Sequence, residues 1–154
     1  MSTPAALAAD AAGISYRVLR HGRVSSVAEA AAASGVEIQD LVKTLVVRRA
    51  DDDYVFVLVP GDRAISWPKL RALLGVSRLS MPDADTAKAA TGYERGTITP
   101  FGSARPWPVI ADERTRGRTI NLGAGEHGVG LQVAADEAVA ALDGAFADVT
   151  QPAP

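Results

Sequence analysis

Apolar and polar positions alternate or cluster along the chain in a way that predicts several short strands. Two β-branched runs, 43–48 and 54–59, flank the polar turn 51–53, and this arrangement is typical of an antiparallel hairpin. The second run is apolar without a break, which favours a central strand covered on both faces. Further strands are expected over 14–19, 78–81, 107–111, 119–122 and 129–133.

Short runs rich in alanine or leucine lie between these strands and are bounded by helix-capping residues. Ser, Thr or Asp precedes most of the runs, and glycine follows several of them. Helices are therefore predicted over 5–12, 27–34, 36–41, 67–74, 84–91 and 135–142. The segment 92–106 is rich in glycine and proline and is expected to be a loop. The predicted fold class is α+β, or mixed α/β, with a strand-rich centre.

The chain has 154 residues, which suits one domain with a sizeable core. Its composition, 47% apolar and 22% charged, is that of an ordinary globular protein. We expect a single domain over 1–150 and a flexible tail over 151–154, because this end is polar and proline-rich. Neither a signal peptide nor a bilayer-spanning apolar run is recognised, so a cytoplasmic protein without membrane contact is expected.

The chain has no cysteine and only two histidines, His21 and His127. A disulfide framework, a thiolate nucleophile and a cysteine-containing zinc site are therefore excluded, and a histidine-rich metal site is not expected. We predict neither a metal nor a cofactor. The formal net charge of −2 argues against a protein that coats nucleic acid through bulk charge. It still allows one end of a nucleic acid to dock on a local basic patch.

The segment 123–128, GAGEHG, matches the dinucleotide-binding pattern G-x-G-x-x-G. That pattern is meaningful only where a helix begins at the last glycine, and here the alternating run 129–133 predicts a strand instead. The residues that follow leave little room for a βαβ unit. We interpret the segment as a glycine-rich turn and reject the hypothesis of a dinucleotide-binding site. Glycines around His127 would also let a ligand approach the backbone closely.

Three segments occur in a characteristic order: DLVKTLVV at 40–47, VPGD at 59–62 and TGYERGTITPFG at 91–102. The third contains a G-x-x-x-P loop that runs from Gly96 to Pro100. Together these segments resemble the YbaK/EbsC family, which includes free-standing aminoacyl-tRNA deacylases. The same domain is inserted as the editing module of bacterial prolyl-tRNA synthetases. The resemblance extends over about 20–143, most of the chain.

This resemblance implies a central, mostly antiparallel, barrel-like mixed sheet with short helices around it. It also implies a metal-independent hydrolase that acts on ester bonds. The expected activity is that of a trans-editing deacylase, which removes a small, wrong amino acid from a transfer RNA, with tRNA(Pro) as the expected acceptor. The implied partners are the aminoacylated 3′ end of a tRNA and, as a further candidate, an aminoacyl-tRNA synthetase. A monomer or a weak dimer is expected.

The resemblance further implies a pocket walled by main-chain N–H groups, with the ammonium of Lys43 at its lip. The catalytic residues would be Lys43, Gly96 and His127. Lys43 would bind the adenosine phosphate or orient the ester, and the backbone at Gly96 would stabilise the oxyanion. His127, when neutral, would order or deprotonate water. The expected substrate-binding residues are Thr97, Ile98, Thr99, Pro100 and Gly125.

Two other functions stay open at this point. The chain could be a non-catalytic module that binds or regulates aminoacyl-tRNA, or a hydrolase of small acyl esters that needs no RNA. Arg114, Arg116 and Arg118 could hold phosphates of the acceptor stem, although a solvated hairpin tip is the favoured interpretation. The amino acid removed and the tRNA recognised are not determined by these patterns.

Overall fold

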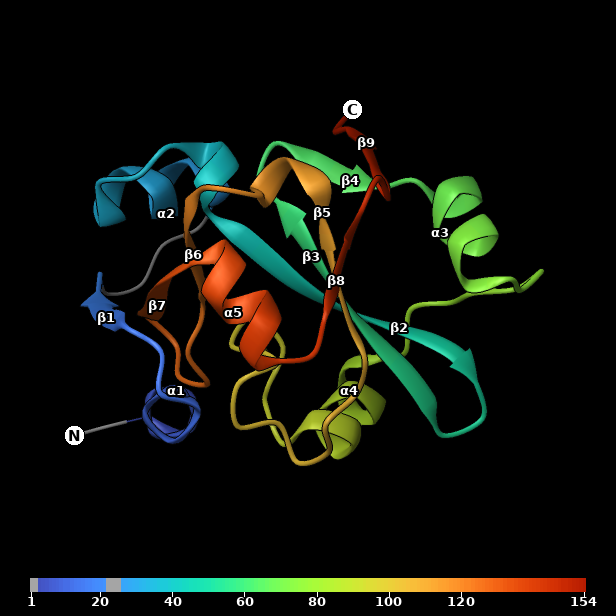
Figure 1. Cartoon of the computed structure of the whole chain (residues 1–154), viewed down its shortest axis with the longest axis horizontal. Helices are drawn as coiled ribbons and strands as arrows, with labels where there is room; N and C mark the ends of the chain where they lie inside the picture. Colours follow the sequence, from blue (N-terminus) through green and yellow to red (C-terminus); the bar gives the residue numbers. More distant parts are fainter. Residues whose placement is uncertain (1–2, 22–25) are drawn as a thin grey trace.

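The computed structural model of the chain describes residues 3–21 and 26–154. Its largest sheet has four strands in the order β2-β3-β5-β8 (Figure 1). These strands are β2 (Val42–Ala50), β3 (Asp53–Pro60), β5 (Val109–Asp112) and β8 (Ala145–Ala147). β2 and β3 form the predicted antiparallel hairpin, whereas β3, β5 and β8 run parallel. The central position predicted for the second hairpin strand is confirmed.

The other described strands form two smaller antiparallel sheets. One has the order β1-β7-β6, and the other pairs β4 with β9. Their bounds are β1 (Tyr16–Arg20), β4 (Arg63–Ile65), β6 (Thr119–Gly123), β7 (Val129–Ala134) and β9 (Thr150–Pro152). The α+β class is confirmed. The strands of the described residues are divided over three sheets, however, and are not gathered into the one barrel-like sheet that we expected.

In the described part of the chain, five short helices surround the sheets: α1 (Pro4–Ala12), α2 (Val27–Ser34), α3 (Trp67–Leu74), α4 (Ala84–Thr91) and α5 (Ala135–Ala141). The capping signals explain several of their starts. Thr3 accepts a hydrogen bond from the backbone N–H of Ala6, and Asp83 accepts one from that of Thr86. α2 and α3 lie towards opposite ends of the molecule (Figure 1).

The structure departs from the sequence prediction mainly in its shortest elements. Residues 78–81 form no strand, and only an isolated bridge joins Ser80 to Arg48. The helix expected over 36–41 is a single 3-10 turn, η1 (Ile38–Asp40), and a second one, η2 (Glu113–Thr115), follows β5. The predicted tail is paired as far as Pro152, because β9 hydrogen-bonds to β4.

Side chains of β2 alternate between two separate cores, and this alternation positions the candidate site. Val46 packs in a buried cluster with residues of β6 and β7, whereas Val47 packs in another with residues of β4 and α3. Because neighbouring residues of a strand point to opposite faces, Thr44 shares the face of Val46 and Lys43 shares that of Val47. The two residues therefore leave β2 in opposite directions.

Candidate functional site

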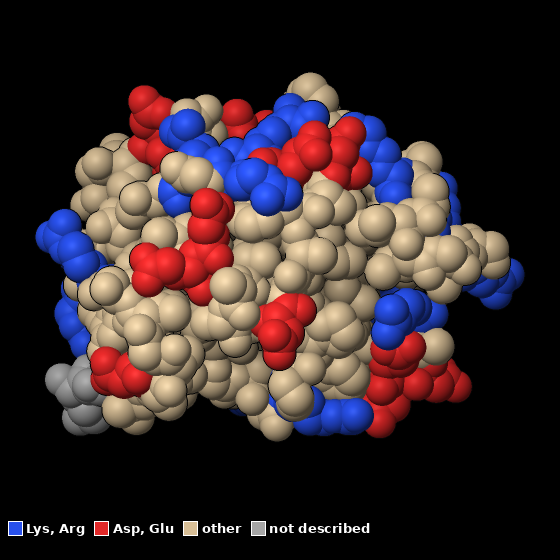
Figure 2. Space-filling view, in the orientation of Figure 1, with Lys and Arg blue, Asp and Glu red and all other residues tan. Residues whose placement is uncertain are grey.

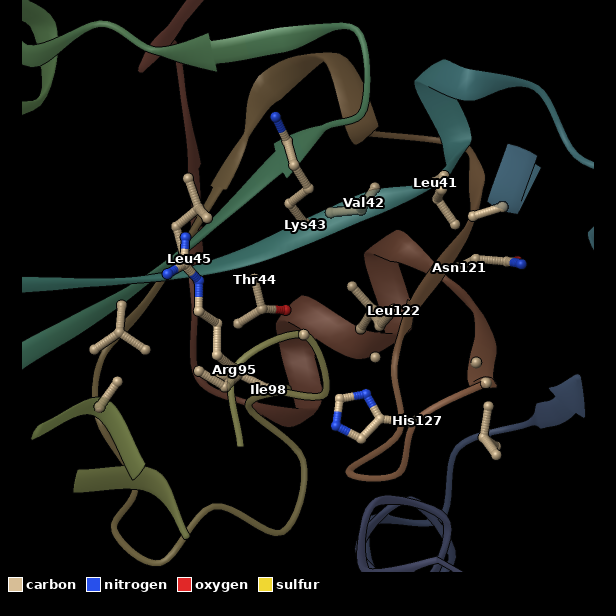
Figure 3. Close-up of a pocket in the computed structure, with 18 of the residues that line it drawn as sticks. Leu41, Val42, Lys43, Thr44, Leu45, Arg95, Ile98, Asn121, Leu122 and His127 are labelled. Carbon is tan, nitrogen blue, oxygen red and sulfur yellow. The ribbon is translucent and has the colours of Figure 1, made fainter. Parts of the chain in front are cut away.

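A cavity of about 1230 Å³ opens beside β2 and contains several of the predicted site residues. It is bordered by α2, the start of β2, the start of α4, the loop after α4 and the β6–β7 turn (Figure 3). Lys43, Gly96, Ile98 and His127 line it, although 84 positions separate the first from the last. The fold therefore brings the three predicted catalytic residues to one cavity.

The G-x-x-x-P loop begins with a tight turn that presents Gly96 to this cavity. The backbone N–H and the hydroxyl of Thr97 both donate to the carbonyl of Glu94, at 3.0 and 2.7 Å. Gly96 has a φ of +90°, a conformation that glycine adopts without strain. Its own N–H has no hydrogen-bond partner among residues 3–21 and 26–154. This N–H is therefore available to a substrate oxygen.

The other members of the loop do not share this position. Thr97 and Thr99 are 3% and 0% exposed, Pro100 is also buried, and none of the three lines the cavity. The hydroxyl of Thr97 is engaged by the turn, so the structure does not direct it towards a substrate. Ile98 is the one residue of this group whose side chain borders the cavity (Figure 3).

The segment GAGEHG is the turn between β6 and β7, as its sequence context predicted. A Cβ atom at Gly123 would lie 2.7 Å from the carbonyl oxygen of Ile98, and one at Gly125 would lie 2.5 Å from the ring of Tyr93. The N–H of Gly125 also donates to the carbonyl of Thr97 at 2.9 Å. These glycines therefore let the turn pack directly on the G-x-x-x-P loop, and Gly125 acts through this packing without lining the cavity.

His127 lies at the mouth of the cavity, next to Gly96. A Cβ atom at Gly96 would be 3.7 Å from Cε1 and 4.0 Å from Nδ1 of the imidazole. Nε2 lies 3.2 Å from a carboxylate oxygen of Glu94, which also forms an ion pair with Lys88 at 3.6 Å. When the imidazole is neutral and Nε2–H donates to Glu94, Nδ1 is left as a hydrogen-bond acceptor on the Gly96 side.

Lys43 borders the same cavity but turns its ammonium away from the glycine loop. Figure 3 shows its side chain on one side of β2, whereas Thr44 extends towards His127 and Leu122. Nζ of Lys43 donates to the carbonyl of Arg63 at 2.8 Å. The ammonium of Lys43 therefore lies on the side of β2 opposite the 96–100 segment. This corrects our expectation that it lies at the lip of the pocket that the main-chain N–H groups wall.

The environment of Lys43 changes the pKa of its ammonium and thereby the pH dependence of stability. Burial lowers the pKa of its ammonium below the ordinary value of 10.5, and the carboxylate of Asp62 offsets part of this effect. Between the lowered folded value and 10.5 the unfolded chain binds more protons, so this group makes stability rise with pH in that window. Lys43→Met removes the titration.

We expect wild type to gain stability relative to Lys43→Met as the pH is raised through the range next to the ordinary pKa of 10.5, from about 9 to about 11. Urea unfolding of both proteins at the two pH values measures the difference, and common effects of other groups cancel in the comparison. A difference that stays constant over this range would show that the ammonium of Lys43 is not desolvated in the folded state.

Other residues of the cavity were not singled out by the sequence. Thr44 has a buried hydroxyl oxygen without a partner in the described part of the chain, and the same holds for Nδ1 of His21. Asn121 is buried and accepts a hydrogen bond from Gln132 at 3.1 Å. Strand alternation after Lys43 could have identified Thr44, whereas His21 and Asn121 approach the cavity only through the pairing of β1, β6 and β7.

The three arginines near β6 do not border the cavity. Arg114 pairs with Asp112 and Asp148, Arg118 pairs with Asp40, and Arg116 lies over the ring of Phe146. Figure 2 shows the same mixture, with basic and acidic side chains interleaved along the upper edge of this face. The expected hairpin tip is not formed, because β5 and β6 belong to different sheets and the 3-10 turn η2 lies between them. The pairing of these arginines within the chain gives no support to a phosphate-binding role.

Within 3–21 and 26–154, no group of three or more His, Asp or Glu side chains is placed to hold a metal ion. In the same part of the chain, no helix has the length and apolar character needed to cross a membrane.

Comparisons with known proteins agree with the geometry. Residues 21–140 match the family model described as "Aminoacyl-tRNA editing domain". The chain is 29% identical over 131 residues to an Enterococcus faecalis protein named "Putative Cys-tRNA(Pro)/Cys-tRNA(Cys) deacylase EbsC", with 84% of this chain and 78% of that protein covered. It is 37% identical over 90 residues to the proline–tRNA ligase of Thermosipho melanesiensis, with 58% of this chain but only 16% of the ligase covered.

A solved structure has nearly the same fold over its whole length. It is described as that of "a putative trans-editing enzyme for prolyl tRNA synthetase" and aligns with a TM-score of 0.86 over 98% of this chain and 99% of that chain. The sequence identity between the two is 23%, so this likeness is evidence for the fold.

Proposed function

Because the chain belongs to the aminoacyl-tRNA editing domain family, we propose that it is a trans-editing deacylase that hydrolyses the ester of a mischarged transfer RNA. The proposed substrate carries a small amino acid on tRNA(Pro). The names of the Enterococcus faecalis relative and of the proline–tRNA ligases support the prolyl acceptor. A cavity that is bordered by both backbone and apolar side chains supports a small aminoacyl group.

One observation carries this proposal: the unengaged N–H of Gly96 and the imidazole of His127 border one cavity. An aminoacyl ester is already activated, so a positioned water and a stabilised oxyanion are sufficient for hydrolysis. The Gly96 N–H supplies a hydrogen bond to the carbonyl oxygen. Nδ1 of His127, left free by the contact of Nε2 with Glu94, accepts a proton from water.

The proposed reaction balances without a metal or a covalent intermediate. Water forms a bond to the ester carbonyl carbon while His127 takes its proton, and negative charge collects on the oxygen that faces Gly96. The bond to the terminal ribose oxygen then breaks, and that oxygen receives the proton from the imidazolium. The products are the free amino acid and the deacylated tRNA.

Of the two roles expected for Lys43, binding the adenosine phosphate and orienting the ester, we keep the first. Its ammonium lies on the other side of β2 and is held by the carbonyl of Arg63. We therefore assign it to the terminal nucleotide, whose phosphate carries the complementary charge, and not to the reacting carbonyl. Ile98 remains assigned to the aminoacyl group, and Thr97, Thr99, Pro100 and Gly125 are assigned to shaping the loop.

A panel of mischarged transfer RNAs tests the proposal. We expect rapid loss of ester from alanyl, seryl, threonyl or cysteinyl prolyl acceptors, and little loss from correctly charged prolyl-tRNA. The rival function, a module that binds aminoacyl-tRNA without hydrolysis, predicts protection of the ester in the same assay. Absence of turnover on all four mischarged prolyl acceptors would contradict the deacylase proposal.

A further inference from the structure

Arg95 directly precedes the G-x-x-x-P loop and is exposed at the edge of the cavity. Its guanidinium has no ion pair or hydrogen bond to any of the described residues. In Figure 3 the side chain extends from the loop towards β2 at Leu45. Several other arginines of the described residues form ion pairs, as Arg48, Arg49 and Arg118 do. An unpaired arginine at a cavity edge is available to an anion from solution.

The carboxylates near Arg95 are engaged by other groups, so its guanidinium is available to an anion from solution. The neighbouring carboxylate of Glu94 is engaged by Lys88 and His127, so it does not neutralise the guanidinium. Asp83 is the acidic residue that lines the cavity, and its carboxylate accepts a hydrogen bond at the start of α4. Among the described residues, the Lys, Arg, Asp and Glu side chains that line the cavity are Lys43, Arg95 and Asp83, in a chain whose net charge is −2. The cavity edge favours a polyanion.

We propose that Arg95 is an RNA-binding residue that contacts a backbone phosphate at the 3′ end of the acceptor strand. The inference rests on the proposed function, because it takes the ester of that strand to react beside Gly96. Arg95 is covalently next to Gly96, and only a ribose separates a nucleotide's phosphate from its esterified hydroxyl. A guanidinium fork matches the geometry of a phosphate.

Binding of an uncharged RNA minihelix that carries the acceptor 3′ end tests this contact without any need for hydrolysis. For Arg95→Gln we expect binding about 3- to 10-fold weaker at low salt, and a slope of log Kd against log salt that is smaller by about 0.7. Arg95→Lys should keep most of the slope. Arg78→Gln is the matched control, since Arg78 is exposed, has no partner among the described residues and does not line the cavity.

Kinetics separate a phosphate contact from a role in the chemistry. With an aminoacylated minihelix, Arg95→Gln should raise KM by about 3- to 10-fold, as it weakens binding, and leave kcat within about twofold of the wild-type value. With aminoacyl-adenosine, which has no phosphate, both constants should match those of wild type. An unchanged salt slope, an equal effect of Arg78→Gln or an equal loss on aminoacyl-adenosine would overturn the assignment. If wild type binds the minihelix without hydrolysing its ester, the proposed function fails, while the slope still decides the role of Arg95.

Discussion

Replacement of Gly125 with alanine should destabilise the protein and remove most of the proposed deacylase activity. Gly125 has a φ of +84°, and an alanine there costs about 1 to 2 kcal/mol for the left-handed backbone alone. The added Cβ atom would also lie 2.5 Å from the ring of Tyr93. Tyr93 cannot give way easily, because it is buried and its hydroxyl donates to the carbonyl of Phe101 at 2.6 Å.

The expected total is a loss of about 2 to 5 kcal/mol, once the cost of overpacking is added to that of the backbone. For a chain of this size that corresponds to a melting temperature lower by about 5 to 15 °C. The deacylation rate of the molecules that remain folded should also fall, because the turn that carries His127 must move away from Gly96. Thermal unfolding and the deacylation rate of the folded fraction measure the two effects.

Gly117→Ala is the matched control for this variant. Gly117 has a similar φ of +76°, but a Cβ atom there would meet nothing within 4 Å. It should therefore show the backbone cost alone and keep full activity. If Gly125→Ala were no more harmful than Gly117→Ala, packing of the turn on the G-x-x-x-P loop would not be what requires glycine.

His127→Ala should lower kcat by about 100-fold or more, the usual effect of removing a general base. The side chain is 68% exposed and its contact with Glu94 is a surface interaction, so the stability of the fold should change little. KM should also change little, because the strand is held by groups other than the imidazole. Single-turnover rates on a mischarged prolyl acceptor, together with urea unfolding, measure these quantities.

The neighbouring residue provides the control for His127. Glu126 lies in the same turn, is 57% exposed and forms a long ion pair of 3.8 Å with Arg20. Glu126→Ala should therefore be close to wild type in rate and in stability. A His127→Ala variant with wild-type kcat would remove the imidazole from the mechanism and leave the backbone at Gly96 as the main catalytic group.

Local patterns were sufficient to predict the elements that carry strong signals of their own. The hairpin of β2 and β3 follows from two β-branched runs around a polar turn, and four helices follow from their caps. β4, β8 and β9 have three residues each, too few for periodicity to show, and they form only because distant segments pair with them. The same tertiary pairing orders the end of the chain up to Pro152.

The candidate site was predictable in part, because Lys43, Gly96, Ile98 and His127 line the cavity, whereas the other predicted residues, Thr97, Thr99, Pro100 and Gly125, do not. The order of Lys43, the G-x-x-x-P loop and the glycine-flanked His127 indicated a common cavity, and the fold brings them to one. The direction of the Lys43 side chain depends on which face of β2 each core occupies, and that depends on packing. The contact of Glu94 with His127 and the unpaired state of Arg95 likewise appear only when the two loops meet.

We propose that the main-chain N–H of Gly96 and the imidazole of His127 let water cleave the ester without a metal. The most direct test is the rate of ester loss from alanyl-tRNA(Pro) with wild-type protein, measured in parallel with and without excess chelator. Equal rates are expected under both conditions, each at least about 100-fold above the rate in buffer alone. A rate equal to that in buffer, or one that the chelator abolishes, would contradict the proposal.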